Sequence, residues 1–73
     1  MKKTLLALLK DENNLLQMHG FYVDHELKVA SFDLIFNYDE KDAQKKCDEM
    51  RMKMEEQYPS FQFYVNLDRD FTD

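Results

Sequence analysis

Side chains that commonly bind divalent cations lie in two strand-like parts of this sequence. The stretch QMHGFYVDHELKVASFDL, residues 17–34, contains His19 and Asp33. The stretch VNLDRD near the other end supplies Asn66 and Asp68. An imidazole, two carboxylates and an amide oxygen form a reasonable ligand set for a divalent metal ion. These four residues are therefore the candidate metal ligands.

Whether the four side chains meet depends on how the strands pair. Asp33, Asn66 and Asp68 converge if the second and third predicted strands are neighbours. His19 joins them on one condition, because directly opposed residues of an antiparallel hairpin point to the same side. An odd-numbered turn at 25–27 would oppose His19 to Asp33. An even-numbered turn would place His19 on the core face, unless a bulge changed the count. The competing interpretation is a solvated face with scattered acids.

Three segments have the composition and alternation of strands. The first runs from about Leu16 to Val23, the second covers KVASFDLIFNY, and the third is FQFYVNLD at 61–68. Alternation is clearest in the second segment, because its apolar positions share one face and its polar positions share the other. The apolar positions, which predict the core, are Ala30, Phe32, Leu34 and Phe36.

Two segments have helical periodicity. The first begins near Thr4, a possible N-cap, and the second follows Asp39, also a candidate N-cap. The second helix should end before Pro59, since the residue preceding a proline disfavours helical backbone. The apolar positions at helical spacing are Leu5, Leu8 and Leu9 in the first helix and Ala43, Cys47, Met50 and Met54 in the second.

The elements therefore follow the order α-β-β-α-β. This order predicts an α+β two-layer sandwich with a three-stranded sheet, ferredoxin-like or metallochaperone-like, formed as one domain by residues 1–73. Both helices should cover one face of the sheet. The other face carries Ile35 and Tyr64 among polar groups, so a second copy of the chain could cover it and make a homodimer.

Composition excludes several classes of protein. A single cysteine, Cys47, rules out an internal disulfide and a cysteine-rich zinc site. The net charge of −5 argues against a nucleic-acid partner. The apolar run LLALL is too short for a signal peptide or a membrane span. No nucleophile-base constellation or phosphate-binding loop is present, so we expect a non-enzymatic domain. His25 lies in the predicted turn and is expected to be an ordinary surface residue.

Four motifs resemble the cytoplasmic C-terminal domain of cation diffusion facilitator (cation efflux) transporters. They are MHGFYV in the first strand, SFDLIF in the second, EEQYPSFQF at the end of the second helix, and YVNLDRD closing the third strand. The resemblance covers nearly the whole chain. It implies a cytoplasmic, metallochaperone-like regulatory domain that forms a homodimer, binds zinc or a related divalent cation near the dimer interface, and tunes transport by the membrane domain of the same transporter.

The resemblance also implies roles for individual residues. His19 matches the first-strand histidine ligand, and Asp68 matches the acid that follows the third strand. Asp33, Asn66 and Gln44 fall at or near positions where family members often have histidine. This oxygen-rich replacement points to manganese as well as zinc. The alternative is a stand-alone α+β interaction or small-molecule regulatory module with no metal role.

Overall fold

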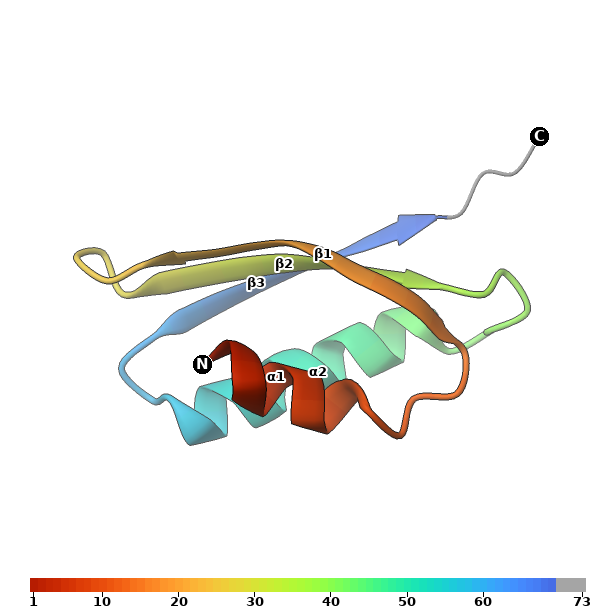
Figure 1. The fold of residues 1–73 in the computed structure, drawn as a ribbon, viewed down its shortest axis with the longest axis horizontal. Coiled ribbons are helices and arrows are strands. Elements are labelled where there is room, and N and C mark those ends of the chain that lie inside the picture. The colour runs from red at the N-terminus through yellow and green to blue at the C-terminus, as the bar shows by residue number, and fades with distance from the viewer. Residues whose placement is uncertain (70–73) are drawn as a thin grey trace.

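The computed structural model describes residues 1–69, which form five elements in the predicted order. The elements are α1 (Lys2–Leu9), β1 (Leu15–Asp24), β2 (Val29–Phe36), α2 (Ala43–Gln57) and β3 (Gln62–Arg69). Both helices lie on one face of the sheet, and no described residue forms a layer over the opposite face (Figure 1). The predicted α+β two-layer sandwich is thus confirmed.

The sheet is mixed, with β2 in the centre. Its order is β1-β2-β3, with β1 antiparallel to β2 and β2 parallel to β3. The parallel pair requires a crossover, which α2 provides. The residues of β2 therefore have partners on both sides, and side chains from all three strands meet along its length.

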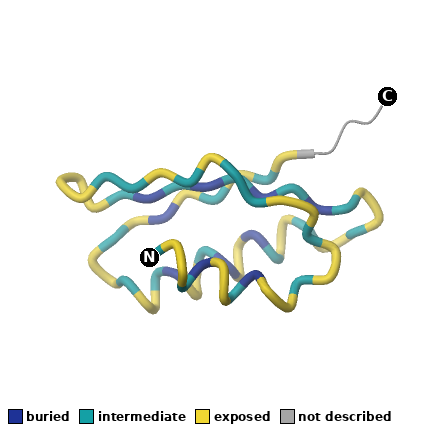
Figure 2. Tube along the Cα trace, viewed as in Figure 1, coloured by how far each residue is buried: buried dark blue, intermediate teal, exposed yellow. Residues whose placement is uncertain are grey.

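The core lies between the sheet and the helices. Burial alternates along β2, where Ala30, Phe32 and Leu34 are fully buried, as the sequence pattern predicted. Figure 2 shows the buried residues of the strands and helices facing one another across the two layers. The remaining buried apolar residues are Leu5 and Leu9 of α1, Phe36 of β2, Cys47, Met50 and Met54 of α2, and Phe63 of β3.

The helix starts differ from those predicted. Helix α1 begins at Lys2, so Thr4 lies inside it, and the Thr4 hydroxyl shares a 2.8 Å hydrogen bond with the hydroxyl of Tyr58. Asp39 does not cap α2, which has Asp42 at the N-cap position without a side-chain cap bond. The polar run before α2 forms turns instead, since Asn and Asp side chains also bond the backbone of turns. Within residues 1–69, neither helix is long and apolar enough to span a bilayer.

One lysine of α2 ties the helix to both loops at the same end of the sheet. Lys46 Nζ lies 3.1 Å from Glu12 Oε2 in the α1–β1 loop and 2.6 Å from Glu40 Oε1 in the β2–α2 loop. Asn14 Nδ2 donates to the same Glu40 oxygen at 3.1 Å. These contacts hold the entries to β1 and α2 together.

Candidate cation site on the uncovered face of the sheet

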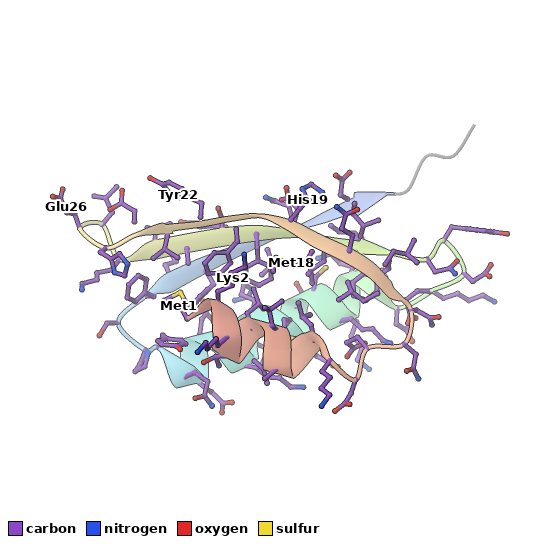
Figure 3. The ribbon with its side chains drawn as sticks, viewed as in Figure 1. Met1, Lys2, Met18, His19, Tyr22 and Glu26 are labelled. Carbon is purple, nitrogen blue, oxygen red and sulfur yellow. The ribbon has the colours of Figure 1, made fainter. Side chains whose placement is uncertain are left out.

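The face of the sheet without helices, called the uncovered face below, is a grid of four cross-strand rows. Residues in register on neighbouring strands point to the same side, so the pairing of β1, β2 and β3 defines each row. Figure 3 shows His19 and Tyr22 pointing away from the helices and Met18 pointing toward them. From one end to the other the rows are Asp24–Val29–Gln62, Tyr22–Ser31–Tyr64, His19–Asp33–Asn66 and Gln17–Ile35–Asp68.

A β-bulge places His19 on this face. His19 pairs with Asp33 and Tyr22 pairs with Ser31, so the paired positions are three residues apart on β1 but two residues apart on β2. Gly20, at the bulge, has a φ of +68°. A glycine at positive φ is typical of a bulge, which adds one residue to a strand and thereby reverses the facing of all later residues in that strand.

The predicted reason for this pairing is wrong, although the pairing itself is confirmed. The β1–β2 loop contains four residues, 25–28, and Asp24 pairs with Val29, so the three-residue turn at 25–27 does not form. Asp24 Oδ1 accepts from the N–H groups of Glu26 and Leu27, at 3.0 and 2.9 Å, and thereby closes the longer loop. A loop with an even number of residues would, by itself, turn the side chain of His19 toward the helices. The extra residue at the bulge reverses this facing, so His19 lies on the same side as Asp33.

The imidazole of His19 lies between two carboxylates. Its Nδ1 is 3.7 Å from Asp33 Oδ2, and its Nε2 is 3.7 Å from Asp68 Oδ2. Asn66 Nδ2 donates a 3.0 Å hydrogen bond to Asp33 Oδ1, which fixes the orientation of that carboxylate. All four predicted ligands therefore lie on one face and form a connected chain of contacts.

The arrangement gives two partial sites rather than one complete site. Asp33 and Asp68 face opposite nitrogens of the same ring, so each nitrogen has one carboxylate beside it. Among residues 1–69, no three His, Cys, Asp or Glu side chains are close enough to hold one metal ion together. Zinc sites normally use three or four protein ligands. The described residues of one copy therefore supply an incomplete ligand set for zinc.

The other candidate residues lie elsewhere. Gln44 is on α2, in the helical layer, where its Nε2 donates to Asp48 Oδ1 at 3.3 Å. His25 is an exposed loop residue whose ring packs edge-on against Phe61, with ring centres 5.9 Å apart. Cys47 of α2 is buried in the core, away from the uncovered face, and this burial raises the pKa of its thiol to about 11.

Sequence reasoning missed Tyr22 as a residue of the uncovered face. Without the bulge, Tyr22 and His19 would point to opposite sides, since they are three residues apart. The sequence signal for this bulge was Gly20, because an isolated glycine within a strand pattern suggests a bulge.

No family model, no curated protein and no solved structure matches this chain.

Proposed function

We propose that this chain is the cytoplasmic, dimerising and metal-sensing domain of a divalent cation efflux transporter, with no enzymatic activity of its own. The observation that carries the proposal is the imidazole of His19 held between Asp33 and Asp68 on the uncovered face. The α-β-β-α-β order and the four motifs that resemble cation diffusion facilitator C-terminal domains support the same function.

The partial sites support a link between metal binding and dimerisation in this proposal. Each partial site presents one histidine nitrogen beside one carboxylate, which amounts to two ligands. One partial site from each of two copies supplies two nitrogens and two carboxylates, a set that suits zinc, while the Asn66 amide oxygen adds a harder ligand that suits manganese. A bound ion would therefore be shared by the two copies.

Electrostatics gives the ion a second effect. The twelve positions of the uncovered face include Asp24, Asp33 and Asp68 but no lysine or arginine. Two such faces repel each other when they approach without a cation between them. A divalent ion removes this repulsion, so the cation concentration would control how the two copies are arranged and, through them, the membrane domain.

Thermal unfolding tests the proposal directly. We expect zinc or manganese to raise the melting temperature relative to EDTA, since an ion that binds only the folded form adds about 2.7 kcal/mol at 100 times its dissociation constant. His19→Ala and Asp68→Asn should lose most of this rise, and His25→Ala is the matched control that should keep it. The rise should also shrink as the pH falls, because only neutral imidazole binds metal.

The alternative is an interaction module without a metal role. It is favoured by the absence, within residues 1–69, of a preformed group of three ligands. Equal melting temperatures in EDTA, zinc and manganese would support this alternative, as would a rise that His19→Ala and Asp68→Asn both retain.

A further inference from the structure

Two tyrosines flank a small residue on the uncovered face, next to the candidate cation site. Tyr22 and Tyr64 both pair with Ser31, so they stand on either side of it in one cross-strand row. Tyr22 is 58% exposed and Tyr64 is 49% exposed. Between the two tyrosines, the central strand presents the short side chain of Ser31. Neither ring contributes to the core or to the cation site.

Carboxylates lie on both sides of this row. Asp24 follows Tyr22 by two residues on β1, and Asp33 follows Ser31 by two residues on β2. Because β1 and β2 are antiparallel, the two acids lie on opposite sides of the row. Residues two apart on a strand are about 7 Å apart. The face therefore offers an acid, an aromatic pair and a second acid at roughly this spacing, and none of its twelve positions is lysine or arginine.

We propose that this row is a docking site for a basic segment of a partner protein, extended and with arginine at alternate positions. A guanidinium stacks on tyrosine rings and pairs with carboxylates, and it does both better than an ammonium group. Alternate side chains of an extended segment lie on one side at the same spacing of about 7 Å as the rows of the face. Without a cation between them, a second copy fits this row poorly, because it would bring the same acids to the same place. An anionic partner is repelled for the same reason.

The proposal goes beyond the metal-sensing function, and the two can be tested separately. The probe is an acetylated and amidated peptide in which arginine alternates with serine. It is titrated in EDTA, so that the result does not depend on whether the domain binds metal. Ring signals of all four tyrosines are followed by nuclear magnetic resonance, and the dissociation constant is measured by calorimetry.

We expect the peptide to shift the ring signals of Tyr22 and Tyr64 and to leave those of Tyr38 unchanged. Tyr22→Ala and Tyr64→Ala should each weaken binding about two- to fivefold, the range for a cation over a half-exposed ring. Tyr38, 89% exposed, lies in the β2–α2 loop, which makes Tyr38→Ala the matched control that should bind normally. Tyr22→Phe should bind like the wild type, because the ring is kept. A peptide with lysine in place of arginine should bind more weakly.

Several results would overturn the proposal. Equal weakening by Tyr38→Ala would mean that the peptide binds exposed tyrosines in general rather than this row. Unchanged binding by the Tyr22→Ala, Tyr64→Ala double variant would exclude the two rings. Absence of any shift at millimolar peptide would exclude the site. Finally, a dimer in EDTA that the double variant dissociates would identify a second copy, rather than a basic segment, as the occupant.

Discussion

At the scale of single residues, Gly20 decides whether the candidate site exists. Its φ of +68° is rarely adopted by residues with a Cβ, and a Cβ added there would lie 2.9 Å from Asp33 Oδ2. The contacted atom is the end of a side chain, so Asp33 can move away, but it would then leave His19 and Asn66. A larger residue at position 20 therefore affects both the fold and the site.

We predict that Gly20→Ala lowers the free energy of unfolding by about 1–2 kcal/mol, the cost of left-handed backbone for an ordinary residue. Chemical denaturation measures this change, and Gln17→Ala, an exposed position on the same strand, is the control. Gly20→Asn separates the two causes, since asparagine tolerates positive φ but still carries a Cβ. Equal stability of Gly20→Ala and wild type would contradict the bulge.

The burial of Cys47 leads to a second testable prediction, which concerns the reactivity of its thiol. It is 1% exposed, and burial, with a smaller contribution from Asp48, raises the pKa of its thiol to about 11. Only the thiolate reacts readily with alkylating reagents.

We therefore expect iodoacetamide to leave Cys47 unmodified in the folded protein at neutral pH and to label it fully in denaturant. Mass spectrometry measures the extent of labelling. Cys47→Ser should cost about 1–3 kcal/mol, because the hydroxyl is buried where the thiol packed as an apolar group. Labelling of the native chain as fast as of the unfolded chain would show that α2 does not pack as described.

At the scale of elements, the ion pairs of Lys46 hold α2 against the two neighbouring loops. Hydrogen bonds from Lys46, from Asn14 and from the Asp42 backbone N–H, in that order of effect, lower the pKa of Glu40 from 4.5 to about 2. The bond to Glu40, and then that to Glu12, raises the pKa of Lys46. These shifts mean that the charged forms of both groups are favoured by the folded state.

The sign of the Glu40 shift gives a pH dependence. A carboxyl with a lowered pKa stabilises the fold above its unfolded value, near 4.5, and this contribution is lost as the pH falls toward 2. We predict that Glu40→Gln lowers the melting temperature at pH 7 and that the difference from wild type shrinks between pH 4.5 and pH 2. Melts across this range measure it, with Glu56→Gln, an exposed position of α2, as the control. A difference that stays constant with pH would contradict the proposed role of the charge.

At the scale of the whole molecule, the sheet has helices on one face only, and the other face is acidic. This asymmetry makes association dependent on cations under the proposed function. We predict that the chain sediments mainly as a monomer in EDTA and as a dimer when zinc or manganese is added at high micromolar protein. His19→Ala should stay monomeric with the ion, and His25→Ala should dimerise like the wild type. Monomer under all conditions would contradict dimerisation of this domain.

The sequence by itself determined the elements and the core. Alternation in β2 and the apolar stripe of α2 are local patterns with fixed periods, so they predicted which residues the two layers bury. The same periodicity predicted that Asp33, Asn66 and Asp68 share the polar face of their strands. The structure brings them together on one side of the sheet because β2 and β3 pair without a shift in register.

Only the tertiary structure decided the position of His19 and the role of Tyr22. The side of the sheet to which His19 points depends on two numbers, the number of residues in the loop 25–28 and the one extra residue at the Gly20 bulge. An error of one residue in either number would place His19 on the opposite side. The odd-turn prediction placed His19 correctly because it left out both the fourth loop residue and the bulge, and these two omissions cancel. Register is set by pairing between strands and by turn geometry together, and neither is contained in the periodicity of a single strand.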